Sequence, residues 1–272
     1  MDSARRFGVL LTLAYDGTAF QGWASQKEGR TVCDAVHGAI TAVDPRASQP
    51  RGTSRTDSGV HAEGQLAAFD ACLEIPARGW VLALNRHLPD DACVRSARAV
   101  PVGYNPRFGA KLKRYRYRIL LDRVRDPLWR TRAWRVGWPV DKERLAREAE
   151  SIRGTHDFAA FRSSHDARTV TVRTITRVAV EPESDPRILG IVIEGESFLY
   201  NMVRILVGTL MDVARGKLER GTIARALESG SSGAVSRPEL RRMAGTTAPA
   251  HGLTLEAIDL TLPDDAGQAW PP

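Results

Sequence analysis

The stretch Ser54-Arg55-Thr56-Asp57-Ser58-Gly59-Val60-His61 joins a carboxylate, a cation two residues before it and a glycine two residues after it. It predicts a tight turn, because Gly59 can adopt backbone angles closed to other residues and because Ser and Asp side chains can bond turn amides. Such a turn can hold Asp57 outward, with Arg55 close enough to keep the carboxylate ionised at neutral pH. The same residues could instead form a surface turn with a weak Arg–Asp ion pair.

The composition is that of a globular protein with a basic surface. The 272 residues are 43% hydrophobic and 26% charged, and 39 Lys and Arg against 32 Asp and Glu give a formal net charge of +7. This balance is typical of nucleic-acid binders, although many basic proteins bind no nucleic acid. The length permits one large domain or two ordinary ones.

Several other classes of protein lack their usual signatures in this sequence. The three cysteines lie far apart without a CxxC pair, which predicts free thiols, a reducing compartment and no metal site. The chain has no signal peptide and no apolar stretch of membrane-spanning length, so we expect a cytoplasmic protein. A P-loop, a GxGxxG after a strand and a GxSxG elbow are all absent.

Apolar periodicity and turn residues divide the chain into strands and helices. Strands are predicted over 7–15, 65–71, 92–100, 113–121, 170–182, 188–194 and 253–260. Helices are predicted over 32–43 after Thr31 as N-cap, 76–86, 141–152 with Asp141 as N-cap, 197–215 with Gly216 at its end, and 219–229. The ends, 1–6 and 266–272, are expected to be loose.

The likeliest boundary between domains is the Pro- and Gly-containing segment 101–106. It separates an N-terminal half, 1–104, which carries the Asp57 turn, from a C-terminal half, 105–272, which we expect to complete the active site and an RNA cleft. Each half contains strands with helices between them. The pattern predicts an α+β fold with two similar halves that share a mostly antiparallel sheet.

The basic segment before residue 120 separates into two faces if it is a strand. Lys113, Tyr115 and Tyr117 point one way, and Arg114 and Arg116 the other. A base can stack on a tyrosine ring, and arginines can neutralise phosphates. The alternative is a half-buried strand whose tyrosines belong to the core and whose arginines are solvated.

Arg204 lies in the predicted helix 197–215, which is apolar on most sides. A lone buried charge is prohibitive, so the guanidinium needs a partner. Since Glu196 and Asp212 are each eight residues away, the partner must come from elsewhere in the fold, and Asp57 is one candidate. A structural ion pair with another acid, or a side chain that reaches solvent, would also satisfy it.

Six stretches, in order along the chain, resemble motifs of the TruA family of tRNA pseudouridine synthases. The octapeptide is similar to the family's catalytic G-R-T-D-[AS]-G-V-H, and Tyr15 to Gln26 to its N-terminal Y-D-G-[ST]-x-[FY]-x-G-W-x-x-Q. The other matching stretches are Arg107-Phe108 with Lys113 to Tyr117, Gly154 to Phe158 with Phe161, Phe198 to Arg204, and Pro249 to Leu253. One departure is Ser54, where the family usually has glycine; it excludes backbone conformations open only to glycine.

The resemblance implies the pseudouridine synthase fold, with helices on one side of the sheet, and isomerisation of uridine at positions 38, 39 and 40 of the tRNA anticodon arm. It implies that Asp57 is the catalytic carboxylate, attacking C1′ of the sugar or C6 of the base. Arg55 and Arg204 would keep that carboxylate charged and placed, and Arg55 would also occupy the position that a flipped uridine vacates. Tyr115 would stack on the base and assist proton removal at C5.

The resemblance also implies the partners. Lys113, Arg114 and Arg116 would bind the RNA, a homodimer would hold one tRNA against both subunits, and no cofactor or metal would be required. Two other functions remain as alternatives. One is a catalytically silent tRNA-binding protein of the same fold. The other is a glycosidase-like hydrolase, which normally needs two carboxylates, and Glu63 is the only other acid near Asp57 in sequence.

Overall fold

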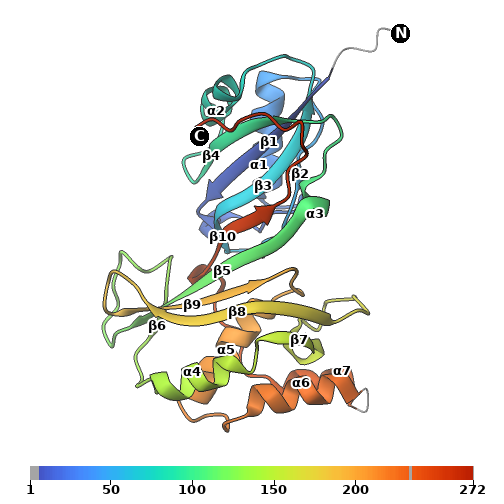
Figure 1. The fold of residues 1–272 in the computed structure, drawn as a ribbon. Helices are drawn as coiled ribbons and strands as arrows, with labels where there is room; N and C mark the ends of the chain where they lie inside the picture. The colour runs from blue at the N-terminus through green and yellow to red at the C-terminus, as the bar shows by residue number, and fades with distance from the viewer. Residues whose placement is uncertain (1–5, 233–234, 272) are drawn as a thin grey trace. The chain divides into compact units, whose positions relative to one another are not determined.

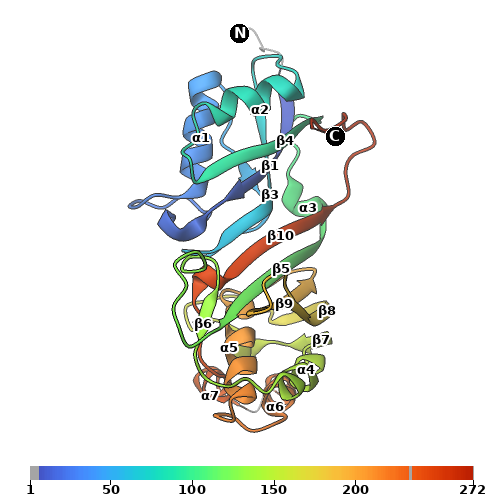
Figure 2. The ribbon, with the colours of Figure 1, turned by 90° about the vertical axis from the view of Figure 1, so that its left-hand side faces the viewer.

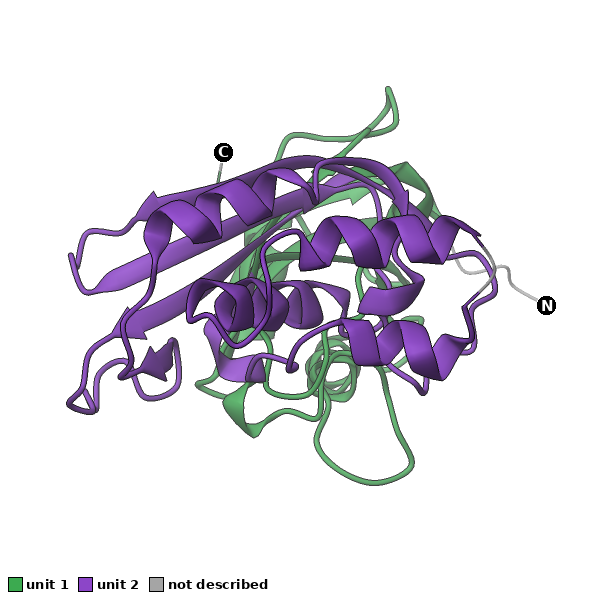
Figure 3. Cartoon of the chain, turned by 90° about the horizontal axis from the view of Figure 1, so that it is seen from below, with its two compact units in different colours: residues 1–111, 255–272 green, residues 112–254 purple. Residues whose placement is uncertain are grey.

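The computed structural model describes residues 6–232 and 235–271, which form ten strands and seven α-helices (Figure 1). The strands belong to a large, mostly antiparallel sheet, so the predicted α+β class is confirmed. The chain divides into two compact units, residues 1–111 with 255–272 and residues 112–254 (Figure 3). None of the helices in the described part of the chain is long and apolar enough to span a bilayer.

Unit 1 places four strands in the order β4 (Ala92–Val100), β1 (Phe7–Tyr15), β3 (His61–Ala71) and β10 (Leu253–Leu260), with β2 (Arg51–Gly52) paired to β3. The helices α1 (Val32–Val43) and α2 (Ala77–Asn85) lie on one face of these strands (Figure 2). Trp80 of α2 packs edge-on against Phe69 of β3, with ring centroids 5.1 Å apart. As predicted, Thr31 caps α1 by accepting a hydrogen bond from the Asp34 N–H at 3.2 Å.

The other face of unit 1 is covered by the C-terminal segment. Leu10, Leu66, Ala68 and Val100 form a buried cluster, and Tyr104, Ile258, Leu260, Leu262 and Ala266 pack against it. Trp270 then exchanges two backbone hydrogen bonds with Ala97 of β4, at 2.9 and 3.0 Å. The expectation of a loose end is therefore wrong for 266–271, because this segment is anchored by backbone pairing that its sequence does not reveal. Residues 1–5 and 272 lie outside the described residues.

Because the chain returns to unit 1 at its C-terminal end, the observed units also differ from the predicted division at residue 104. The short helix α3 (Pro106–Gly109) and the residues after 254 belong to unit 1, where the Thr261 N–H bonds the Gly109 carbonyl at 3.0 Å. A sequence boundary drawn at a Pro-rich segment cannot show that the chain comes back 150 residues later.

Unit 2 places β5 (Ala110–Leu121), β9 (Ile188–Gly195), β8 (Val172–Pro182) and β7 (Gly154–Asp157) in that order, with β6 (Trp134–Val136) parallel to β5. Helices α4 (Lys142–Glu150), α5 (Met202–Ala214), α6 (Thr222–Ser232) and α7 (Arg237–Met243) lie below β8 and β9 in Figure 1. Strand β9 is buried along its whole length, and nearly every residue of α5 is buried. The core of this unit lies between that strand and helix.

Two helix starts in unit 2 differ from the prediction, and a third helix was not predicted. Helix α5 begins at Met202 instead of residue 197, because Asn201 has φ 60° and interrupts the helical backbone. It ends at Ala214 with Arg215 as C-cap, and Gly216 follows with φ +79°, the glycine expected at this end. Helix α6 starts at Thr222 instead of 219, where the Glu148 carboxylate accepts the N–H groups of Gly221 and Ile223, each at 2.8 Å. Helix α7 was not predicted, although its capping box is readable in the sequence.

Candidate active site

The Asp57 segment is a tight turn, as the sequence predicts. The Val60 N–H bonds the Asp57 carbonyl at 3.1 Å, and Gly59 between them has φ +78°, a conformation that favours glycine. Val60 is buried while Ser58 is exposed and Asp57 is half-buried. The turn therefore packs its hydrophobic end into unit 1 and leaves the aspartate partly open to solvent.

The backbone before Asp57 is fixed by buried polar groups. Gln65, fully buried on β3, accepts from the Ser54 N–H at 3.2 Å and donates to the Ser54 carbonyl at 2.6 Å. The Thr56 hydroxyl lies 2.8 Å from the Tyr15 hydroxyl, and the Thr56 carbonyl accepts from the Trp23 N–H at 3.1 Å. Three side-chain or backbone groups from other segments thus hold the two residues that flank Arg55.

The N-terminal motif lies beneath this turn. Phe20 and Trp23 are buried and pack against the Tyr15 ring at centroid distances of 6.3 and 6.5 Å. A Cβ atom on Gly17 would stand 2.1 Å from the Val60 carbonyl oxygen, so only glycine permits this approach. The aromatic residues of the motif support the Asp57 turn from below.

The exposure of Arg55 and the backbone angles of Ser54 bear on two expectations from the sequence. Arg55 is exposed, and an ion pair between it and Asp57 stays a prediction. Its neighbours Ser54 and Thr56 are both buried. Ser54 has no positive φ, so this turn does not require the glycine that the family usually carries.

The two faces of β5 in unit 2 are the predicted ones. Tyr115 and Tyr117 are buried, whereas Arg114 is exposed. The Tyr115 ring packs edge-on against Phe198, with ring centroids 5.1 Å apart and an interplanar angle of 84°. The Tyr117 hydroxyl donates to the Pro249 carbonyl at 2.8 Å, and burial raises the pKa of Tyr117 far above its ordinary value.

The arginine face of β5 is paired with glutamates of the neighbouring strands. Arg114 Nε lies 2.8 Å from Glu194 Oε1 on β9, and Arg116 lies 2.9 Å from Glu183 in the turn between β8 and β9. A second contact joins Arg116 to Glu181 at 3.4 Å. These acids could not be assigned from the sequence, because pairing between β5, β9 and β8 is needed to bring them opposite the arginines.

Arg204 is held by neutral acceptors in its own unit. Its Nε donates to the Ala248 carbonyl at 2.8 Å, and an NH1 hydrogen bond of 2.9 Å reaches Asn201 Oδ1. The Ala248 N–H in turn donates to the Arg204 carbonyl at 3.0 Å. Arg204 is half-buried at the first turn of α5, so it escapes the full cost of a buried charge that the predicted longer helix would have imposed.

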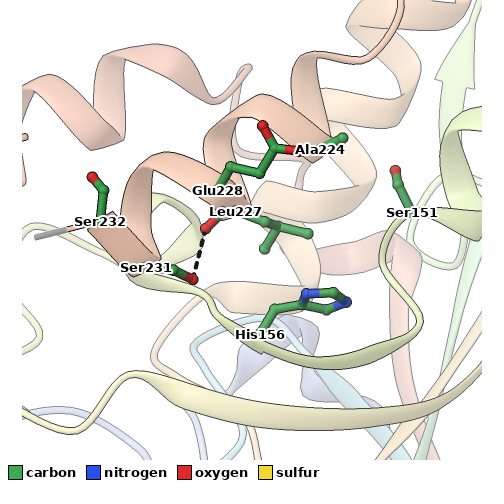
Figure 4. Close-up of a pocket in the computed structure, with 7 residues that line it drawn as sticks. All are labelled: Ser151, His156, Ala224, Leu227, Glu228, Ser231 and Ser232. Atoms are coloured by element: carbon green, nitrogen blue, oxygen red, sulfur yellow. Dashed lines mark hydrogen bonds between the residues drawn. The ribbon is translucent and has the colours of Figure 1, made fainter.

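A cavity of about 450 Å³ lies elsewhere in unit 2, between α6 and β7 (Figure 4). Its lining residues are Ser151, His156, Ala224, Leu227, Glu228, Ser231 and Ser232. His156 bonds the Arg153 carbonyl at 2.9 Å, and no residue predicted for the active site lines this cavity. Within residues 6–232 and 235–271, no cluster of His, Cys, Asp and Glu could hold a metal ion.

Comparison with known proteins gives a consistent family. The model of a family described as tRNA pseudouridine synthase matches residues 12–109 and 149–259. The chain is 43% identical over 250 residues to tRNA pseudouridine synthase A of Acetivibrio thermocellus, covering 92% of this chain and 98% of that protein. It is 40% identical over 252 residues to the protein of the same name from Halalkalibacterium halodurans, covering 92% of each chain.

Proposed function

The chain belongs to the tRNA pseudouridine synthase family, and on that premise we propose that it isomerises uridine to pseudouridine at positions 38, 39 and 40 of the tRNA anticodon arm. The observation that carries the proposal is the turn that presents Asp57, half-buried, on a backbone fixed on both sides. A carboxylate acting as nucleophile must be ionised and held in place, and this turn supplies a fixed support.

Asp57 is the proposed catalytic carboxylate. The uridine must leave the RNA stem before its glycosidic bond can be reached, which costs unstacking and unpairing energy. Asp57 then attacks C1′ of the sugar or C6 of the base, the base detaches from C1′ through N1 and rejoins C1′ through C5, and the bond to Asp57 breaks so that the carboxylate is released. N1 gains a proton in exchange for the one that C5 loses. The C5 proton leaves in the last step, so the reaction is internal to the nucleotide and redox-neutral.

The remaining site residues are assigned by their chemistry. Tyr115 stacks on the extruded base and assists proton removal at C5, with its ring already fixed on one edge by Phe198. Arg55, exposed beside Asp57 in sequence, occupies the position that the uridine vacates. Arg204 contributes positive charge toward the reacting carboxylate.

The wider partners follow from the same proposal. Lys113, Arg114 and Arg116 contact tRNA phosphates, and two copies of the chain form a homodimer that holds one tRNA. The protein acts in the cytoplasm, and its reaction needs no cofactor. The competing proposal is a protein of the same fold that binds tRNA without modifying it.

The decisive experiment is pseudouridine mapping of bulk tRNA that lacks the modification, after incubation with wild-type protein, Asp57→Asn and the neighbouring exposed-residue control Ser58→Ala. We expect new pseudouridine at 38–40 with the wild type and with Ser58→Ala, and none with Asp57→Asn, which should still bind tRNA. Bound tRNA without pseudouridine from any of the three proteins would favour the silent binding protein. Activity retained by Asp57→Asn would remove Asp57 from the chemistry.

A further inference from the structure

The segment 198–201, which joins β9 to α5, carries the ring that contacts Tyr115 and the asparagine that contacts Arg204. Phe198 packs edge-on against Tyr115, and Asn201 accepts from Arg204 at 2.9 Å. The segment is not regular structure, because Asn201 has φ 60° and ψ 5°. A non-glycine residue in this conformation persists only where its surroundings impose it.

The surroundings that impose it come from the loop 163–168. The Asp166 carboxylate, with a side chain only 4% exposed, accepts from the Tyr200 N–H at 2.9 Å. The Ser163 N–H donates to the Tyr200 carbonyl, also at 2.9 Å. Arg168 donates to the Phe198 carbonyl at 3.0 Å. The loop therefore bonds three backbone groups on either side of Leu199.

Asp166 and Arg168 also fix each other. Arg168 NH2 lies 2.7 Å from Asp166 Oδ2, and its Nε lies 2.9 Å from Oδ1. Burial opposes the charged carboxylate, but the hydrogen bonds from Arg168 and Tyr200 outweigh it and hold the pKa of Asp166 well below its ordinary value. The arginine is anchored again at its backbone, since the buried Arg162 donates to its carbonyl.

We propose that Asp166 and Arg168 are positioning residues for the Tyr115–Phe198 ring pair and for Arg204 in the first turn of α5. This inference rests on the proposed function, which assigns Tyr115 and Arg204 to the reacting uridine. Loop 163–168 holds the backbone of Phe198 in place. The Phe198 ring in turn holds the ring of Tyr115, and Asn201 holds the guanidinium of Arg204. Loss of the loop's charge pair moves these groups without removing any of them.

The chain supplies a matched internal control. Asp185 and Arg187 repeat the same Asp-x-Arg arrangement in the turn between β8 and β9, with an Arg187 NH2 to Asp185 Oδ2 distance of 2.8 Å. In both pairs the backbone N–H of the arginine also donates to the aspartate Oδ1, at 3.0 Å for Arg168 and 2.9 Å for Arg187. Arg187 bonds Asp126 and Asp122 there, and no group of the proposed site. The two pairs have the same chemistry, but only the Asp166–Arg168 pair bonds the segment that carries Phe198 and Asn201.

The test compares Asp166→Asn with Asp185→Asn in steady-state pseudouridine formation and in thermal unfolding. We expect Asp166→Asn to lower kcat about 10- to 100-fold with KM for tRNA largely unchanged, because a displacement near 1 Å costs this much in a positioned site. Asp185→Asn should keep the wild-type kcat even if its Tm falls as far. Arg168→Lys, which keeps the charge but cannot bridge Asp166 and the Phe198 carbonyl together, should give an intermediate kcat.

The outcomes separate this inference from the function on which it rests. An inactive wild-type protein would reject the proposed function itself. An active wild type with equal kcat in Asp166→Asn and Asp185→Asn would reject the positioning role. If Asp166→Asn does not fold, Arg168→Gln and Arg187→Gln make the same comparison. A double mutant with Phe198→Leu should lose less than the product of the single effects, and a fully multiplicative loss would show that Asp166 does not act through Phe198.

Discussion

The Gln65 side chain bonds both backbone groups of Ser54, accepting from its N–H at 3.2 Å and donating to its carbonyl at 2.6 Å. Gln65 is fully buried on β3, two residues of chain separate Ser54 from Asp57, and Ser54 itself is buried. After β2, the hydrogen bonds that fix the backbone at Ser54 therefore come from a side-chain amide and not from strand pairing.

Replacing this amide should cost stability. Gln65→Leu keeps the volume but removes the hydrogen bonds that the amide makes to the buried Ser54 N–H and carbonyl, and a lost partner of a buried polar group costs about 1–3 kcal/mol. We expect the free energy of unfolding to fall by about 2–4 kcal/mol in urea titration. Gln49→Leu, at an exposed position, should change it by less than about 0.5 kcal/mol. Equal losses in the two variants would mean that the Ser54 bonds contribute nothing.

The two tyrosines of β5 should separate catalysis from stability. Tyr115→Phe keeps the ring that packs against Phe198 but loses the hydroxyl proposed for proton transfer, so kcat should fall while the Tm changes little. Tyr117→Phe loses the buried bond to Pro249, so its unfolding free energy should drop by about 1 kcal/mol with kcat largely retained. Full activity in Tyr115→Phe would exclude its hydroxyl from the reaction.

The arginine face of β5 should affect how strongly tRNA binding depends on salt concentration. Arg114 is 45% exposed although it is paired with Glu194, so it can still reach a phosphate. If it does, Arg114→Gln should weaken tRNA binding and reduce the slope of log K against log salt by about 0.7–0.9. Arg225→Gln removes a similarly exposed arginine paired with Glu219 and should leave the slope unchanged. An identical slope in Arg114→Gln and the wild type would assign Arg114 to the glutamates alone.

The sequence predicted the elements whose signals are local, and missed those whose cause lies elsewhere in the chain. Thr31 and Asp141 cap their helices as expected, since each accepts from an N–H three residues ahead. The start of α6 depends on Glu148, which is more than 70 residues earlier, and no local pattern reports it. The start of α5 depends on the Asn201 conformation, which the loop 163–168 imposes.

The same distinction applies to the candidate site. The turn at Asp57 and the two faces of β5 follow from glycine placement and from period-two alternation, both of which are visible in the sequence. The glutamates opposite Arg114 and Arg116, the amide behind Ser54 and the neutral acceptors around Arg204 come from strand pairing and chain return. The sequence around Asp166 does not indicate that this acid is near the site, because the same Asp-x-Arg pair occurs at Asp185.

Asp70 should govern part of the acid stability of unit 1. Burial opposes its charge, but the paired hydrogen bonds from Arg51 and the bond from the Gly103 N–H hold the pKa of Asp70 below its ordinary value of 3.8. A carboxyl whose pKa is lowered on folding contributes stability above its unfolded pKa and loses it as the pH falls through the folded pKa. Asp70→Asn should therefore be less stable than the wild type at pH 7, and the difference should shrink below about pH 4. Urea unfolding at pH 7 and pH 3 measures this, with the exposed Asp90→Asn as control; a constant difference would contradict it.

Two glycines of unit 1 make the last comparison, because one touches the Asp57 turn and the other touches nothing. A Cβ on Gly22 would stand 2.6 Å from the Thr56 carbonyl oxygen, and Gly22 has φ +87°, so Gly22→Ala must shift the backbone that leads into Asp57. Gly38 lies exposed within α1, and a Cβ there would have no neighbour within 4 Å. We expect Gly38→Ala to stabilise the protein by about 0.5–1 kcal/mol with unchanged kcat, since alanine is the better helix former.

Gly22→Ala should lower both the unfolding free energy, by about 1–3 kcal/mol, and kcat. A Gly22→Ala variant that is destabilised yet turns over at the wild-type rate would show that the chemistry does not depend on where this turn holds Asp57.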